Sequence, residues 1–204
     1  TGRRPLDRRL WQRLDSSVRA TDGAFTIPEE LASRPVGSAL IYVSLGSLGS
    51  ADVDLMRRLV AVLAETPHRY IVSKGPQHDQ YELAPNMWGA EFVPQTSIIP
   101  LVDLVVTHGG NNTTTEAFHF GKPMVVLPLF WDQYDNAQRV DETGFGRRMA
   151  TYAFSDDELR LALDTLLANQ ELRTRMAGIG AEIRARDGVG RAAAAIESVG
   201  LGAR

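Results

Sequence analysis

The chain lacks several features that would place it in particular classes of protein. It has no cysteine, so no disulfide can form within it. Its apolar runs are too short to span a bilayer, no amino-terminal signal peptide is visible, and neither an internal repeat nor a low-complexity tract occurs. The formal net charge is only −3, which gives no sign of a nucleic-acid-binding surface. From these absences we expect a cytoplasmic protein that neither spans a membrane nor binds nucleic acid.

Metal-ligand patterns are also missing. The four histidines, His68, His78, His108 and His119, form no pair with metal-ligand spacing, and no carboxylate cluster has it either. None of the four stands in a convincing arrangement for a catalytic base. We therefore predict no metal site, no cofactor and no catalytic residue within this chain.

What the chain does contain is an alternation of strand and helix patterns. With 44% hydrophobic residues among 204, it can bury a sizeable core. Short apolar, β-branched runs predict strands at 39–45, 69–73, 87–92, 101–107 and 124–128. Helical patterns lie between and after them, at 51–65, 112–120, up to 143, 155–168, 171–185 and 189–199. The alternation predicts an α/β fold with a doubly wound parallel sheet.

The first 38 residues differ from the rest. They mix arginine, aspartate and proline without a sustained period, although residues 6–18 are compatible with a short helix. We interpret residues 1–38 as a linker or surface arm and residues 39–204 as one domain. At the other end, Ser155 and Glu158 predict a capping box.

The most informative segment runs from Thr107 to Glu116, where a predicted strand is followed by a predicted helix. Glycines at the start of a helix let an anion approach unpaired backbone N–H groups and the positive end of the helix dipole. Asn112 and Thr113 add side-chain donors, and His108 can donate an imidazole N–H to a phosphate oxygen. Glu116 lies about one turn further on, where a carboxylate suits ribose hydroxyls. The same residues are also compatible with an ordinary N-cap cluster after a tight turn.

A second polar segment follows the strand predicted at 124–128. Asp132 and Gln133 come after its carboxyl end, the edge where open parallel sheets place ligands. Asp132 is also suited to capping the helix that follows. Two neighbouring strand ends with polar residues predict one binding site, and the residues of the first segment suit a nucleoside diphosphate.

The stretch from Phe92-Val-Pro-Gln95 through His108-Gly-Gly-Asn-Asn112 to Asp132-Gln133 and Asn136 resembles the signature of the family 1 nucleotide-sugar-dependent glycosyltransferases. The run from Ile41 to Ser47 resembles the first strand of their carboxyl-terminal domain. The resemblance implies the carboxyl-terminal, donor-binding half of a GT-B fold, most like the bacterial natural-product and macrolide enzymes. The donor would be a UDP-sugar or a dTDP-sugar.

The family's site residues carry over to matching positions here. The resemblance implies diphosphate contacts from Ser44, Gly46, Ser47, His108, Gly110, Asn112 and Thr113. It implies nucleoside contacts from Phe92, Val93, Gln95 and Glu116, and sugar contacts from Asp132 and Gln133. Phe92 stands where many members carry a base-stacking tryptophan, and is also compatible with a core aromatic. Gly46 and Ser47 are also compatible with a simple turn.

In this family a second, amino-terminal domain binds the acceptor and supplies the catalytic base, and this sequence has no counterpart of it. We therefore expect the chain to be a carboxyl-terminal half that is inactive alone. In the resembling family the final helix crosses back to the amino-terminal domain, so the alanine-rich face near Arg191 to Ile196 is expected to be an exposed apolar patch. The resemblance implies inverting, metal-independent transfer of a hexose to a hydroxyl of a small-molecule natural product. Two alternatives stay open: the donor-binding subunit of a split, two-chain transferase, and a non-catalytic nucleotide-sugar-binding module.

Overall fold

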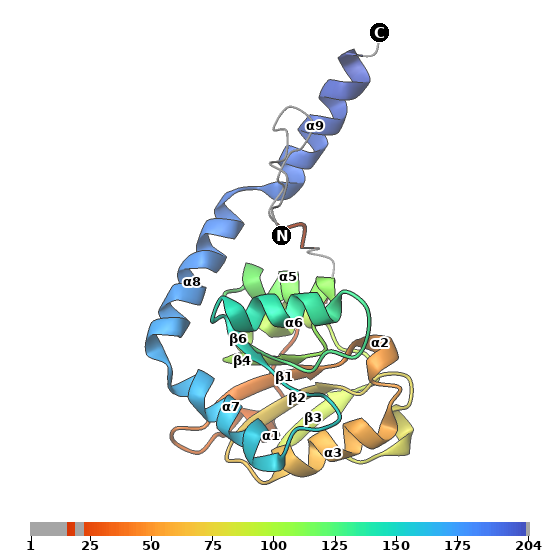
Figure 1. Ribbon diagram of the computed structural model, residues 1–204, viewed down its shortest axis with the longest axis vertical. Coiled ribbons are helices and arrows are strands. Elements are labelled where there is room, and N and C mark those ends of the chain that lie inside the picture. The colour runs from red at the N-terminus through yellow and green to blue at the C-terminus, as the bar shows by residue number, and fades with distance from the viewer. Residues whose placement is uncertain (1–15, 19–22, 203–204) are drawn as a thin grey trace.

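The computed structural model describes residues 16–18 and 23–202 of the chain. Its centre is one six-stranded sheet in the order β3-β2-β1-β4-β5-β6, with every neighbouring pair parallel (Figure 1). The strands are β1 Leu40–Ser44, β2 Arg69–Ser73, β3 Met87–Ala90, β4 Leu104–Thr107, β5 Met124–Val126 and β6 Gly146–Arg148. The predicted doubly wound parallel sheet is confirmed.

Helices alternate with the strands along the chain. They are α1 Glu29–Ala32, α2 Gly46–Gly49, α3 Val53–Ala64, α4 Gln95–Ile98, α5 Asn111–His119, α6 Gln133–Glu142, α7 Asp156–Ala168, α8 Gln170–Ala185 and α9 Gly188–Gly202, with short 3₁₀ turns at His78–Gln80 and Ile99–Leu101. Within the described ranges, no helix is long and apolar enough to cross a membrane.

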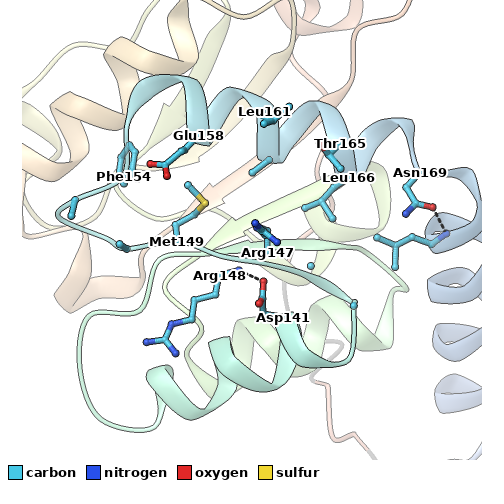
Figure 2. Close-up of a pocket in the computed structure, with 16 residues that line it drawn as sticks. Asp141, Arg147, Arg148, Met149, Phe154, Glu158, Leu161, Thr165, Leu166 and Asn169 are labelled. Atoms are coloured by element: carbon cyan, nitrogen blue, oxygen red, sulfur yellow. Dashed lines mark hydrogen bonds between the residues drawn. The ribbon is translucent and has the colours of Figure 1, made fainter.

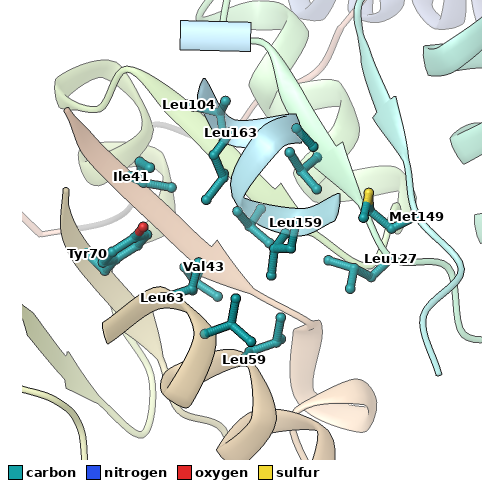
Figure 3. Close-up of a cluster of buried hydrophobic side chains, with 14 of the residues drawn as sticks. Ile41, Val43, Leu59, Leu63, Tyr70, Leu104, Leu127, Met149, Leu159 and Leu163 are labelled. Atoms are coloured by element: carbon teal, nitrogen blue, oxygen red, sulfur yellow. The ribbon is translucent and has the colours of Figure 1, made fainter. Parts of the chain in front are cut away.

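Each face of the sheet is covered by its own set of helices. Figure 3 shows one face, where Leu59 and Leu63 of α3 and Leu159 and Leu163 of α7 meet the apolar side chains of the strands. On the other face, buried residues of α1, α4, α5 and α6 pack on Leu40 and the strand residues beside it. Successive strand residues belong to opposite clusters, as the period of two requires.

Most element boundaries match the sequence pattern, and the differences have local causes. The capping box of Ser155 and Glu158 is present and starts α7. The strand predicted from residue 101 begins only at Leu104, because residues 99–101 form a 3₁₀ turn instead. Strand β6 was not predicted: it is three residues long and carries two exposed arginines at the edge of the sheet, so it lacks the apolar run of a buried strand.

The described part of the amino-terminal segment packs against the body. Leu31 of α1 is fully buried, and the ring of Phe25 lies 5.5 Å from that of Trp88 in β3. Of the helix expected over residues 6–18, only 16–18 fall among the described residues, and they are not helical. At the carboxyl end, α9 extends away from the sheet in Figure 1 and exposes Ile196 and Val199, as expected for its apolar face.

Candidate nucleotide-binding site

The predicted diphosphate residues meet where the strand order reverses. The sheet runs outward in opposite directions from β1 and β4, and Ser44 at the end of β1 is in register with Thr107 at the end of β4. A crevice outside the carboxyl ends of two such strands is where open α/β sheets bind ligands. A cavity of about 460 Å³ opens here. Its walls are Tyr42, Ser44, Gly46, Ser47, Ser73, Gly75, Phe92, Val93, Gln95, Thr96, Asn112, Thr113 and Glu116.

His108 follows β4 and lies in a slot between two turns. A Cβ atom added to Gly46 would come within 2.9 Å of its ring, and one added to Gly110 within 2.4 Å of Nε2. Real Cβ atoms do not approach other atoms so closely, so glycine at both positions makes room for the imidazole. Gly46 also has a φ of +69°, which disfavours any side chain. The turn after β1 and the turn after β4 therefore fix the ring jointly.

Burial lowers the pKa of His108 from its ordinary value of 6.5. A hydrogen bond with the backbone of Ser44 and the charge of Asp132 act in the opposite direction but are weaker. Nδ1 lies 3.4 Å from the hydroxyl oxygen of Thr107, which also accepts a hydrogen bond from the backbone N–H of Gly109. The ring is thus neutral at neutral pH and carries one N–H.

We expect His108 to titrate below pH 6.5 in the folded protein. Because its pKa is lowered on folding, its neutral form stabilises the fold fully above pH 6.5, and this contribution is lost as the pH falls through the lower folded value. An NMR titration of the ring measures this pKa. Measured by urea unfolding, the free energy of unfolding of His108→Gln should fall less on acidification than that of the unmodified chain. A ring that titrates at or above 6.5 in the ligand-free protein would contradict the burial argument.

Helix α5 begins directly after this turn. Its N-cap is Gly110, and no side chain caps it, so the reading of Asn112 and Thr113 as N-cap residues is wrong. The first N–H groups of α5 therefore have no side-chain cap at the cavity. Asn136 of α6 holds the turn in place: its amide donates to the carbonyl of Gly109 at 2.8 Å and to Oδ1 of Asn111 at 2.9 Å. Asn136 was part of the motif, but the sequence did not indicate that its side chain holds this turn.

Glu116 and Gln95 line the same cavity and contact each other. Nε2 of Gln95 donates to a Glu116 carboxylate oxygen at 2.5 Å and to the Thr113 hydroxyl at 3.2 Å. The hydroxyl of Tyr42 donates to Oε1 of Gln95 at 2.9 Å. Tyr42 was not singled out in the sequence, although it stands two residues before Ser44 and therefore shares its face of β1.

Phe92 and Val93 border the cavity beside these residues. The side chain of Phe92 is 63% exposed, so the reading of it as a core aromatic is wrong. A flat, accessible ring at this rim is suited to stacking on a base. Val93 is half-buried, packs on the core and also lines the cavity.

Asp132 and Gln133 lie outside the walls of this cavity. Asp132 is exposed and occupies the N-cap position of α6, but its side chain makes no capping hydrogen bond, so the predicted side-chain cap is wrong. Its charge acts on His108. Gln133 is only 4% exposed, and its Oε1 accepts hydrogen bonds from the backbone N–H groups of Leu129 and Phe130 at 2.9 and 3.1 Å. It shapes the turn before α6, which no sequence signal indicated. Their contacts with a sugar stay a prediction.

A second cavity, of about 520 Å³, lies between β6 and α7, away from the motif residues (Figure 2). Leu161, Leu166 and Met149 line it, and the exposed backbone N–H of Arg148 donates to Asp141 at 3.1 Å. It contains no predicted site residue. Among residues 16–18 and 23–202, no group of three His, Asp or Glu side chains could hold a metal ion.

The comparisons with known proteins agree with this geometry. Residues 30–178 match the family described as UDP-glucoronosyl and UDP-glucosyl transferase. The chain belongs to this family. Among curated members, it is 31% identical over 170 residues to the oleandomycin glycosyltransferase of Streptomyces antibioticus, covering 81% of this chain and 40% of that protein. It is 30% identical over 162 residues to the NDP-glycosyltransferase YjiC of Bacillus subtilis, covering 78% of this chain and 41% of that protein.

A solved glycosyltransferase has the same fold. The crystal structure of the glycotransferase of kitacinnamycin superposes with a TM-score of 0.81 and 30% identity, over 95% of this chain and 50% of that one. The chain thus spans half or less of the length of these three relatives. The family and the GT-B type of fold, suggested by the motif, are confirmed.

Proposed function

We propose that this chain is the donor-binding domain of an inverting, metal-independent glycosyltransferase. The intact enzyme would move a hexose from a UDP-sugar or dTDP-sugar to a hydroxyl of a small-molecule natural product. The observation that carries the proposal is the placement of His108 in a glycine slot at the switch point of the sheet, beside a cavity that Glu116 also lines. One end of this arrangement suits a diphosphate and the other suits a ribose.

Each group has a role in this reaction. The N–H of the neutral His108 ring and the first N–H groups of α5 meet the negative charge that grows on the departing diphosphate. The hydroxyls of Ser44, Ser47 and Thr113, with the amide of Asn112, add donors. Phe92 stacks on the base, Val93 offers its backbone, and Gln95 and Glu116 face the ribose. Asp132 and Gln133 hold sugar hydroxyls. The assignment of sugar contacts to Asp132 and Gln133 rests on the resemblance alone.

The remaining chemistry needs groups that this domain does not contribute. A base in a second domain takes the proton of the acceptor hydroxyl, whose oxygen attacks the anomeric carbon from the side opposite the leaving group. The bond from that carbon to the diphosphate breaks, and the nucleoside diphosphate departs with the electron pair. This domain positions the donor and stabilises the leaving group. We therefore expect no transfer by this chain alone.

Calorimetric titration with UDP and with dTDP in EDTA tests the donor site. We expect saturable, metal-independent binding of at least one of them. His108→Ala and Glu116→Ala should each weaken it by about 10- to 100-fold, the effect of losing a hydrogen bond with a charged partner. His78→Ala is the matched control, since this half-exposed histidine lies outside the cavity walls. Unchanged affinity in both site variants would refute the assignment.

The two alternatives make different predictions. A donor-binding subunit of a split transferase would regain activity when mixed with a separately encoded acceptor domain. A non-catalytic nucleotide-sugar module would bind its ligand without supporting transfer in any combination. The presence together of Glu116, Asp132 and Gln133 favours a domain that still handles a donor sugar.

A further inference from the structure

The hydroxyl of Tyr42 is a polar group placed deep in the domain, at the floor of the candidate site. Tyr42 lies in the middle of β1 and is 1% exposed. It is in register with Ile71 of β2 on one side and Val105 of β4 on the other, so its backbone is fixed from both sides. Its hydroxyl reaches Gln95 at 2.9 Å and borders the cavity. A strand paired on both sides thus presents the Tyr42 hydroxyl to the Gln95 amide.

The chemistry of the partners fixes the direction of these hydrogen bonds. An ionised carboxylate can only accept, so Gln95 must turn its NH₂ group toward Glu116. Its carbonyl oxygen then faces Tyr42, whose hydroxyl must donate. The opposite orientation of the amide would set its carbonyl oxygen against the carboxylate of Glu116. The Glu116 carboxylate therefore selects the orientation of the Gln95 amide, and the Tyr42 hydroxyl holds the amide in place by donating to its carbonyl oxygen.

Gln95 needs such support because its own element is short. It is the first residue of α4, which has only four residues, and its side chain is half-buried at the cavity wall. The Thr113 hydroxyl is compatible with either end of the amide, since it accepts from Nε2 at 3.2 Å and also lies 3.4 Å from Oε1. Of the contacts described here, only that with the Glu116 carboxylate distinguishes the two ends, and the contact with Tyr42 ties the amide to a buried strand.

We propose that Tyr42 is a positioning residue of the nucleoside site: through Gln95, its hydroxyl orients the Glu116 carboxylate toward the sugar hydroxyls of the bound nucleotide. The proposal rests on the proposed function, because it concerns the same site. Tyr42 itself touches Gln95 and acts on the ligand through it. The relay Tyr42–Gln95–Glu116 links a buried strand to the sugar-hydroxyl contact.

The test compares two ligands in Tyr42→Phe, which keeps the ring and removes the hydroxyl. The ligands are whichever of UDP and dTDP the unmodified chain binds, and the same nucleotide without sugar hydroxyls (its 2′,3′-dideoxy form). We expect affinity for the first to fall by about three- to tenfold, the effect of one hydrogen bond, and affinity for the dideoxy form to stay unchanged. In a Glu116→Ala background, Tyr42→Phe should cause no further loss.

Tyr70→Phe is the matched control. Tyr70 lies on the adjacent strand β2, is also fully buried, and bonds Thr66 on the opposite face of the sheet. It should change stability without changing either affinity. If Tyr42→Phe does not fold, Gln95→Leu should give the same difference between the two ligands.

The outcomes separate this inference from the proposed function. Equal losses for both ligands, or no loss for either, would overturn the positioning role while leaving the donor site intact. Failure of the unmodified chain to bind any nucleoside diphosphate would overturn the donor site itself, and the relay with it, before any variant is compared.

Discussion

Replacing Gly110 by alanine is expected to weaken diphosphate binding by about 100-fold while leaving the domain folded. The backbone of Gly110 has φ −62° and ψ 147°, which alanine adopts without strain. The added methyl group, however, would lie 2.4 Å from Nε2 and 2.8 Å from Cε1 of His108. The imidazole must therefore leave its slot, and both its N–H and the space for the phosphate are lost. We expect an affinity about 100-fold lower, measured by calorimetry with the preferred nucleotide.

Comparing Gly46 with Gly144 separates this steric effect from backbone strain. Gly46 and Gly144 have nearly the same φ, +69° and +67°, but only at Gly46 would a methyl group meet the His108 ring. Alanine at either position should cost about 1 kcal/mol of stability through the left-handed backbone. Only Gly46→Ala should also weaken nucleotide binding. Retained affinity in both Gly110→Ala and Gly46→Ala would show that the position of the His108 ring does not matter for the ligand.

The α/β fold and the edge of the sheet that carries the cavity could be predicted from the sequence. The strand and helix periods predicted the α/β fold, because apolar residues must follow the geometry of each element. The residues at or after the carboxyl ends of β1, β3 and β4 were expected, from the resemblance, to face one ligand, and the structure places Ser44, Phe92, Asn112 and Glu116 around one cavity. Parallel strands bring their carboxyl ends to one edge, so a pattern along the chain suffices for this.

What the sequence could not reveal depends on contacts between distant segments. Gly46 and Gly110 resembled phosphate-contacting glycines, but their shared role of enclosing His108 is visible only once two turns from separate strands meet. Gln133 resembled a sugar ligand, yet its carbonyl oxygen holds the backbone at Leu129. Strand β6 was not predicted because it lies at the edge of the sheet, where two of its three residues are exposed and no apolar run marks it.

The sharpest prediction for the fold concerns two glycines of α8 with opposite expected effects. Gly178 and Gly180 both lie inside this helix, where alanine is favoured over glycine by about 0.5–1 kcal/mol. A methyl group at Gly178 would meet nothing within 4 Å, so Gly178→Ala should stabilise the domain by about this amount. A methyl group at Gly180 would lie 2.7 Å from the backbone nitrogen of Gly121 and 3.0 Å from the carbonyl of His119.

Both of those atoms belong to the backbone at the end of α5, so no side chain can rotate away to make room. Helix α8 must shift off α5, and we expect Gly180→Ala to lower the free energy of unfolding by about 1–3 kcal/mol despite the better helix propensity. Urea unfolding of the two variants beside the unmodified chain measures the difference. Stabilisation by both substitutions would mean that α8 is not held against the end of α5. Since α5 also carries Asn112, Thr113 and Glu116, the nucleotide affinity of Gly180→Ala then reports whether this packing supports the site.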